Sequence, residues 1–444
     1  MSDMPPAATN VGRTAQSAIY SAGVFGRRPV VPTSPDALAD AARRRMTRTG
    51  WAYVAGGAGA QRTVAANREA FGRYRTVPRQ MVDVGERSLT TTLLGRELPA
   101  PVLFGPVGAL ELAVQHQRGG RAAAPGHAEP ALAAAARDLG LPVVISSQAS
   151  TPMEDTAAAL GDSPRWFQLY WSADDAVAES FVRRAEASGC EAIVVTLDTH
   201  VLGWRTHDLD LGYLPFARAE GIAQYLSDPA FQALVAERVA RTPDPAAPAP
   251  RPTLAAVRAL LSMARHHPGP TWRNLTGPHA RAAVETFLDV FSRSTLTWAD
   301  LAWLRERTTL PILVKGIQHP DDARAALDHG ADGVVVSNHG GRQVDNAVAA
   351  LDTLAPVADA VRAHTETAPV LFDSGVRSGA DVFTALALGA DAVLLGRPWV
   401  YGLALAGADG VRAVATHVLA ELDLTMALAG ASRVDQVGRH NLAG

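Results

Sequence analysis

The segment SNHGGRQVD (337–345) combines residue types that could remove a proton from an acid substrate. His339 follows an apolar run, two glycines come next, and Arg342 lies three residues further on. A histidine can act as a general base near neutral pH, and an arginine can bind a carboxylate through two hydrogen bonds. A lone histidine is more often structural, but this combination favours a site for a 2-substituted acid.

Two more charged residues each end an apolar run and could serve the same site. Asp198 could hold the imidazole of His339 in one tautomer and stabilise its protonated form. Lys315 could stabilise negative charge on a bound cofactor. It could equally be a Schiff-base nucleophile, as in some aldolases, or one half of an ordinary ion pair. These roles of Lys315 stay open.

Two segments near the C-terminus carry a phosphate-binding signal, DSGVRSG (373–379) and LLGRPW (394–399). Gly375 and Gly396 leave backbone N–H groups accessible, and Arg377 and Arg397 add positive charge. Many barrels bind phosphate after strands seven and eight, at a helix N-terminus. These segments therefore predict a phosphate-bearing ligand.

The elements that must position these residues recur from residue 101 onward. Short apolar runs rich in Val, Ile and Leu are typical of parallel strands buried on both faces. Helical stretches separate most of them, and several end in glycine, which suits a left-handed helix cap. The pattern predicts an α/β fold, a (β/α)8 TIM barrel whose site lies at the strand ends. The eight runs are 101–106, 142–147, 165–170, 192–198, 311–316, 332–338, 369–375 and 391–397.

A barrel of about 250 residues leaves part of the 444-residue chain for other segments. Residues 1–99 are expected to form an N-terminal arm, extended over 1–35, and a helical cap. That cap includes a helix over 38–47 that Gly50 interrupts. Residues 100–444 then form the barrel. The long gap after strand 4 predicts a lid insertion, 203–296, between strand 4 and helix 4, with a Pro/Ala linker at 242–252. The alternative is an oligomer contact or a surface decoration, and the segment could also combine these roles.

Composition excludes several classes of protein. Hydrophobic residues make up 48% and charged residues 19%, which is a globular composition. The net charge of −3 offers no basic excess for nucleic acid or a membrane surface. Cys190 is the single cysteine, so we expect a core residue and no metal site of the cysteine-rich kind. No apolar run reaches the length of a membrane span and no signal peptide is visible, which favours a cytoplasmic location.

Seven motifs together resemble the FMN-dependent 2-hydroxy-acid oxidase and dehydrogenase family. The similarity extends from about residue 35 to the C-terminus. Within the family, the segments 146–154, 165–172 and 198–216 and the long insertion look most like lactate 2-monooxygenase. The seven motifs are YVAGGAG (53–59), FQLYW (167–171), TLDT (196–199), LVKG (313–316), SNHGGRQVD (337–345), DSGVR (373–377) and LLGRP (394–398).

The resemblance implies roles for the residues that match. His339 would be the catalytic base, Asp198 its partner, and Tyr170 a group near the substrate oxygen. The substrate carboxylate would be bound by Tyr53, Arg205 and Arg342, together with Tyr170. Lys315 would lie beside flavin N1 and the C2 carbonyl. The residues implied to bind FMN are Pro106, Val107, Gly108, Ser146, Gln168, Thr196, Lys315, Ser337, Asp373, Ser374, Gly375, Arg377, Gly396 and Arg397.

The implied activity is oxidation of a small (S)-2-hydroxy acid, L-lactate above others, by FMN and O2. Oxidative decarboxylation to the shorter acid, CO2 and water would follow, in a homo-tetramer or homo-octamer. An oxidase that releases the 2-oxo acid and H2O2 and a dehydrogenase that uses another acceptor are alternatives within the family. A Schiff-base aldolase and a non-catalytic flavin-binding protein are alternatives from other classes.

The chain departs from the family pattern in two places. Ser374 replaces the first glycine of the usual Asp-Gly-Gly-Val-Arg, so FMN affinity could change or the hydroxyl could itself bond phosphate. The segment 108–135 is longer than the usual turn after strand 1, with His127 as a counterpart of the displaced histidine. Gly108 leaves room near the flavin edge, which favours reaction with oxygen.

Overall fold

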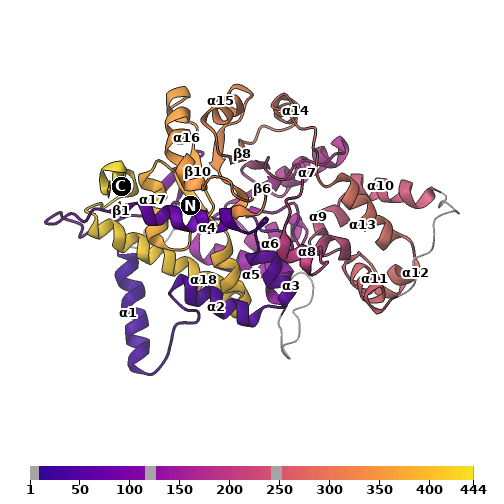
Figure 1. Cartoon of the computed structure of the whole chain (residues 1–444), viewed down its shortest axis with the longest axis horizontal. Coiled ribbons are helices and arrows are strands. Elements are labelled where there is room, and N and C mark those ends of the chain that lie inside the picture. Colours follow the sequence, from indigo (N-terminus) through magenta and orange to yellow (C-terminus); the bar gives the residue numbers. More distant parts are fainter. Residues whose placement is uncertain (1–9, 116–126, 242–252, 444) are drawn as a thin grey trace.

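Eight parallel strands close into a barrel in the computed structural model, which describes residues 10–115, 127–241 and 253–443 (Figure 1). Each strand lies within one residue of a predicted apolar run and is almost wholly buried, which confirms the TIM barrel. Going round the barrel, the order is β10-β11-β4-β5-β6-β7-β8-β9. The strands are β4 (Val102–Phe104), β5 (Val143–Ile145), β6 (Arg165–Leu169), β7 (Ile193–Thr196), β8 (Ile312–Ile317), β9 (Gly333–Val336), β10 (Val370–Phe372) and β11 (Ala392–Leu395).

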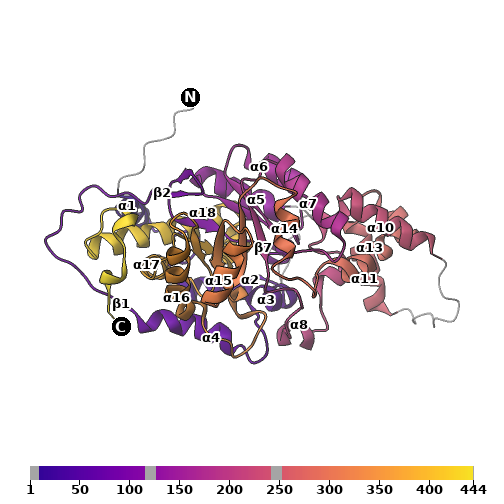
Figure 2. The same ribbon diagram turned by 90° about the horizontal axis from the view of Figure 1, so that it is seen from above.

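One helix follows or precedes each strand on the outside of the barrel (Figure 2). Glycines 140, 189, 330 and 389 near the helix ends all have positive φ, as the sequence predicted. The barrel helices are α5 (Ala128–Leu139), α6 (Met153–Leu160), α7 (Asp175–Ala187), α14 (Asp300–Arg305), α15 (Pro320–Asp328), α16 (Ala350–His364), α17 (Gly379–Ala387) and α18 (Arg397–Leu428).

The inside of the barrel has its own apolar core, separate from the larger core between strands and helices. Alternate strand residues such as Leu103, Trp166 and Leu394 meet there. Leu93 and Leu98 join them from a short hairpin, β2 (Thr91–Leu93) and β3 (Arg96–Leu98). The interior is therefore packed rather than open, and space for a ligand is left only at the mouth.

The N-terminal segment contains a helix that the sequence did not predict. Residues 1–35 were expected to be extended, but α1 (Val11–Val24) forms and packs against α18, which it crosses at a steep angle (Figure 1). The Gly12 N–H donates to Asp423 of α18 at 2.9 Å, and a Cβ on Gly12 would lie 2.7 Å from the Ala420 carbonyl. Val11, Ala15, Ile19 and Ala22 recur at helical spacing, but this apolar stripe is narrow and only partly buried, and Gly12 is the one fully buried residue of α1. The expectation of an extended segment was therefore wrong.

The helical cap forms, but its break lies elsewhere than predicted. The cap consists of α2 (Pro35–Arg45), α3 (Arg48–Ala55) and α4 (Arg62–Glu69). Gly50 lies inside α3 and does not interrupt a helix. The Thr47 hydroxyl accepts the Gly50 N–H at 3.0 Å and so begins α3. The Leu112 carbonyl comes within 2.4 Å of where a Gly50 Cβ would lie, so this glycine serves close packing.

The insertion after β7 forms a helical lobe at one end of the molecule (Figures 1 and 2). Its core is aromatic: the ring centroids of Tyr225 and Phe287 are 4.8 Å apart, and Phe216 packs on Phe287. The predicted linker at 242–252 lies outside the described residues, as do 116–126 of the extended segment. The helices are α8 (Thr206–Asp210), α9 (Ala223–Leu226), α10 (Pro229–Ala240), α11 (Leu254–His266), α12 (Thr271–Thr276) and α13 (His279–Val290).

One helix of the described residues, α18, is long and apolar enough to cross a membrane by length and composition alone. Its backbone leaves helical geometry at Ala406 and Gly407. It packs against α1, α2, α5 and α17. These contacts make α18 a helix of the protein core.

Candidate active site

A cavity of about 930 Å³, part of it open to solvent, lies at the carboxyl ends of the strands. It brings together most of the predicted site residues, although they come from the helical cap, the insertion and six of the strand ends. The predicted residues that line it are Tyr53, Pro106, Val107, Gly108, Gln168, Tyr170, Arg205, Lys315, His339, Arg342, Asp373, Ser374, Gly375, Arg377, Gly396 and Arg397.

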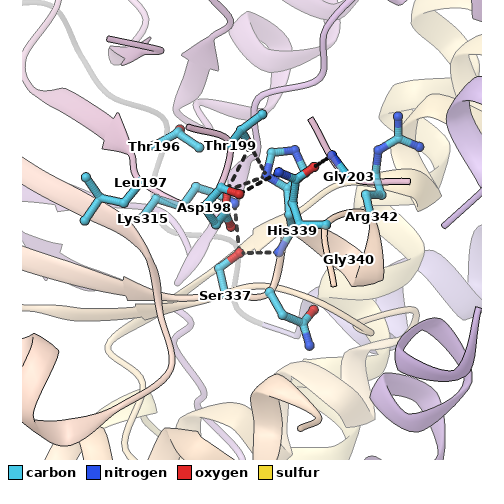
Figure 3. Close-up of polar contacts among 12 residues, drawn as sticks. Thr196, Leu197, Asp198, Thr199, Gly203, Lys315, Ser337, His339, Gly340 and Arg342 are labelled. Atoms are coloured by element: carbon cyan, nitrogen blue, oxygen red, sulfur yellow. Dashed lines mark hydrogen bonds and ion pairs between the residues drawn. The ribbon is translucent and has the colours of Figure 1, made fainter. Parts of the chain in front are cut away.

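His339 and Asp198 form a hydrogen-bonded pair at this mouth (Figure 3). The imidazole Nδ1 lies 2.8 Å from the Asp198 Oδ1, which also accepts the Thr199 hydroxyl at 3.0 Å. An ionised carboxylate only accepts, so Nδ1 carries the proton and Nε2 keeps its lone pair. The Tyr170 hydroxyl lies 3.4 Å from that Nε2.

The electrostatics of this pair suit a base. Burial lowers the pKa of His339 and outweighs the nearby Asp198 carboxylate, which raises it, so the imidazole is neutral at pH 7. Burial by itself would raise the pKa of Asp198, but His339 and Lys315 lower it to about 2. A neutral imidazole beside a carboxylate that stays ionised can take up a proton and be stabilised afterwards.

Arg205 and Arg342 place two positive charges beside the same histidine. The Arg342 guanidinium lies over the Tyr53 ring, 4.9 Å from its centroid, and donates to the Gly56 carbonyl at 3.0 Å. Arg205 donates to the Gln343 amide oxygen at 2.9 Å. Among the described residues neither arginine has a carboxylate within ion-pair distance. Burial and the charge of Arg342 lower the pKa of Arg205 to about 10, so a bound carboxylate would relieve an uncompensated charge.

Arg377 and Arg397 form a second buried cationic group, at the ends of β10 and β11. Arg397 donates to the carbonyls of Val54, Gly340 and Gly56, each at 2.9 Å. Neither arginine pairs with a carboxylate within the described ranges. Burial lowers the pKa of both, that of Arg397 to about 9. A phosphate dianion would supply the missing counter-charge, so these residues fit a phosphate-bearing cofactor.

The backbone beside these arginines is also shaped for close approach. Gly375 has a φ of +96°, and a Cβ there would lie 2.4 Å from the Asn67 carbonyl oxygen. Gly396 comes directly before α18, whose first turn has no side-chain cap. The free N–H groups at that helix start add to the anion-binding character of the site.

Lys315 is an ion-pair residue of the cavity wall. Its ammonium lies 3.0 Å from the Asp373 Oδ2 and donates to the Ser337 hydroxyl at 2.8 Å (Figure 3 shows Lys315 and Ser337). Burial lowers the pKa of Lys315, but Asp373 and Asp198 outweigh it, so the net pKa is raised. A protonated amine cannot form a Schiff base, and this argues against the aldolase alternative.

Four predicted site residues lie behind the cavity lining. The Ser146 hydroxyl donates to the Gln168 amide oxygen at 2.9 Å, and the Gln168 amide donates to Thr196 at 2.9 Å. Ser146 and Thr196 therefore orient Gln168. Ser337 and Asp198 likewise support Lys315 and His339 from behind.

Two functional residues were missed by sequence reasoning. Gln148 lines the cavity, where its Cβ lies 3.1 Å from the position of a Cβ on Gly108. Gln343 joins Arg205 to the backbone of Asp198, to whose carbonyl it donates at 2.6 Å. Gln343 lies inside the motif 337–345 and Gln148 inside the segment 146–154, and this is the signal that could have found them. His127, the expected counterpart of a displaced histidine, is exposed and does not line the cavity.

The chain is similar to known proteins over almost its whole length. Residues 42–444 match the family described as FMN-dependent dehydrogenase. The FMN-dependent alpha-hydroxy acid dehydrogenase qulF of Penicillium citrinum is 38% identical over 98% of this chain and 96% of that protein. An L-lactate oxidase of Lysinibacillus sphaericus is 37% identical over 86% of this chain and 85% of its own length. A mandelate oxidase structure with (S)-4-hydroxymandelic acid superposes with a TM-score of 0.72 and 33% identity, covering 93% of this chain and 98% of that one.

Proposed function

Since the chain belongs to the FMN-dependent dehydrogenase family, we propose that it oxidises a small (S)-2-hydroxy acid, L-lactate above others, with O2 as the electron acceptor. FMN is the cofactor and 2-hydroxy-acid oxidation is the reaction class. The observation that carries the proposal is the neutral His339 beside Asp198, with two arginines at the same cavity that have no carboxylate partner in the described part of the chain.

Arg377 and Arg397 would hold FMN by its phosphate, and Lys315 lines the same cavity. When bound, it accepts the two electrons that leave the substrate α-carbon. Lys315 contributes a fixed positive charge that stabilises the negative charge entering the site. Because Asp373 and Ser337 hold this ammonium in place, little reorganisation is needed during the reaction.

The side chains of the cavity account for substrate binding and proton transfer. Arg205 and Arg342 bind the substrate carboxylate, and this orients the 2-hydroxyl toward His339 Nε2 and the Tyr170 hydroxyl. His339 takes the proton, and the ionised Asp198 stabilises the imidazolium that results. Burial raises the pKa of Tyr170 to about 12, so its hydroxyl stays protonated and can donate to the substrate oxygen.

We further propose that the 2-oxo acid is decarboxylated before release. L-Lactate and O2 then give acetate, CO2 and H2O in equal amounts. Two features support this fate: Gly108, which leaves the lining free of a Cβ, and the insertion beside the mouth, whose Phe216 packs edge-on against Tyr53. A lobe that delays release of the oxo acid allows the second reaction to take place.

A second candidate is a plain oxidase, which converts L-lactate and O2 to pyruvate and H2O2. The 37% identity to an L-lactate oxidase over most of both chains favours it. The test is anaerobic addition of (S)-2-hydroxy acids to the yellow holoenzyme, followed by oxygen and product analysis. Acetate and CO2 support decarboxylation, pyruvate and peroxide support the oxidase, and flavin that no 2-hydroxy acid bleaches contradicts both.

We also propose a homo-tetramer or homo-octamer in the cytoplasm. Val201, Trp204 and Val344 are exposed apolar side chains on neighbouring loops beside the mouth, and such a patch is typical of a subunit contact. Light scattering after gel filtration measures the number of subunits.

A related Arabidopsis thaliana enzyme is named peroxisomal, so cell fractionation is needed to test the cytoplasmic location.

A further inference from the structure

Ser374 follows β10 and occupies a backbone conformation that favours glycine. Its φ is +82°, and its residue surface is 8% exposed. A side chain in this region strains the backbone, and such strain persists only where surrounding contacts stabilise it. The hydroxyl of Ser374 supplies these contacts.

The Ser374 hydroxyl makes three hydrogen bonds within the protein. It donates to the Asp373 Oδ1 at 2.8 Å. It accepts the N–H of Asn338 at 3.2 Å and the N–H of Gly340 at 3.0 Å. A hydroxyl has one donor and two acceptor positions, so its capacity is used up. It therefore has no donor left for a phosphate or for a sugar-like hydroxyl, although it borders the cofactor cavity.

The two N–H groups that Ser374 binds lie on either side of His339. His339, Gly340 and Gly341 have φ values of +57°, +64° and +74°, so the base sits in a run of left-handed backbone that needs support. The N–H of His339 itself donates to the Ser337 hydroxyl at 3.0 Å (Figure 3). Two serine hydroxyls thus hold three consecutive N–H groups.

Both hydroxyls also touch the ion pair of the cavity wall. Ser337 accepts from the Lys315 ammonium at 2.8 Å, and Ser374 donates to the carboxylate of Asp373. Asp373 and Lys315 are themselves 3.0 Å apart. A closed ring of hydrogen bonds therefore connects the loop of His339 to the charged pair.

We propose that Ser374 is a positioning residue for His339, which it ties through the backbone of residues 338–340 to the Lys315–Asp373 pair. This inference rests on the proposed function, which makes His339 the base. It predicts that loss of the hydroxyl slows proton removal and leaves the binding of FMN and of the substrate carboxylate nearly unchanged.

The test compares Ser374→Ala and Ser374→Gly in the holoenzyme. Alanine keeps the Cβ and loses the hydroxyl, whereas glycine also relieves the backbone strain. In both, we expect the rate constant of anaerobic flavin reduction by L-lactate to fall roughly tenfold, because two buried N–H groups lose their acceptor. The apparent Kd values for L-lactate and FMN should stay within about threefold of wild type.

Hydrogen exchange of the holoenzyme without substrate gives a readout that does not depend on activity. Amides in a peptide covering residues 333–345 should exchange faster in both variants. Ser378→Ala is the matched control, because it removes a hydroxyl from the same loop. The Ser378 hydroxyl accepts the Asp381 N–H and caps α17. The substitution should lower thermal stability and leave flavin reduction and exchange at 333–345 unchanged.

Two results would overturn the inference. One is unchanged flavin reduction and unchanged exchange in both Ser374 variants. The other is a large loss of FMN affinity with normal reduction of the FMN-loaded fraction, which would mean that the hydroxyl serves the cofactor. If no 2-hydroxy acid reduces the wild type, the proposed function fails, and the exchange of the 333–345 peptide still tests the hydrogen bonds of Ser374.

Discussion

The Nδ1 of His339 lies 2.8 Å from the Oδ1 of Asp198, although the two residues are 141 positions apart. They follow β9 and β7, two strands that both pair with β8. The pair therefore exists only because the barrel closes in this order. The two side chains are only 16% and 13% exposed, and each charge shifts the pKa of the other, so each can be tested through the other.

His339→Gln should keep FMN bound and lose most of its reduction by substrate. Removal of a general base slows a reaction by roughly 10²- to 10⁴-fold. Stopped-flow absorbance under anaerobic conditions measures the rate constant of flavin bleaching. The control is His329→Gln, which changes an exposed histidine directly after the end of α15 and should react like wild type. Normal bleaching in His339→Gln would contradict its assignment as the base.

Asp198→Asn should move the acid limb of the kcat/KM profile to lower pH. The imidazole must be neutral to accept a proton, so kcat/KM falls as the pH falls through the pKa of His339. Burial lowers this pKa and Asp198 raises it. Without the carboxylate the pKa drops further, and the maximal rate also falls because the imidazolium is no longer stabilised. An acid limb that moves to higher pH would rule out this electrostatic role.

Arg377→Ala should weaken FMN binding by roughly 10- to 100-fold, since a hydrogen bond between charged groups is lost. Arg377 is a better site for this substitution than Arg397. Its guanidinium donates only to the Val376 carbonyl in the described structure, whereas Arg397 donates to three backbone carbonyls, so its loss would also disturb the fold. Fluorescence titration of the apoprotein with FMN gives the Kd. The control Arg412→Ala removes an arginine of α18 that forms ion pairs at the surface, and it should leave the Kd for FMN unchanged. An equal loss of FMN affinity in both variants would refute a phosphate-specific role of Arg377.

Gly108→Ala should slow the reaction with oxygen and increase the share of pyruvate and peroxide among the products. A Cβ at Gly108 would lie 3.1 Å from Gln148 Cβ and 3.2 Å from the Tyr53 hydroxyl, so it would crowd the lining. We expect reoxidation to slow roughly tenfold while anaerobic reduction changes little. Gly72→Ala, where a Cβ meets nothing within 4 Å, is the control. If the rate of reoxidation and the product ratio were unchanged, Gly108 would not determine the reaction with oxygen.

His266→Gln should reduce the loss of thermal stability between pH 6 and pH 8. His266 of α11 lies 3.1 Å from Glu111, which joins the helical lobe to the loop after β4. Burial lowers the pKa of His266, but Glu111 outweighs it, and the net pKa is raised. A raised histidine pKa means that the pair stabilises the fold at low pH and is lost as the pH rises through that pKa.

Other buried acids add to this pH dependence. Burial raises the pKa of Glu129 to about 7 and also raises that of Glu220. Glu129 lies near Glu111, and Glu220 lies near His266 and accepts the Tyr213 hydroxyl. Their ionisation also destabilises the fold as the pH rises, so His266→Gln should remove only part of the change, about 1–2 °C in Tm. His440→Gln, an exposed histidine, should not alter the pH dependence. If His266→Gln showed the same pH dependence as wild type, the His266–Glu111 pair would not stabilise the contact between the helical lobe and the barrel.

The sequence by itself determined the barrel and most of the cavity lining. Each strand is a continuous apolar run, and a run of this kind can be buried on both faces only in a parallel sheet covered by helices. In a barrel the polar residues at the strand ends must converge, so the sequence alone predicts that Lys315, His339 and Arg397 lie together, as they do.

Contacts that depend on distant backbone were decided only by the tertiary structure. The place where α1 packs depends on the bond from the Gly12 N–H to Asp423 of α18, a contact that the local pattern of residues 11–24 does not encode. Ser374 holds the loop of His339 because its left-handed backbone aims the hydroxyl at Asn338 and Gly340. A hydrophobic pattern is a local property and can be read along the chain. A hydrogen bond between two loops depends on the φ and ψ angles of both, which only the packed barrel sets.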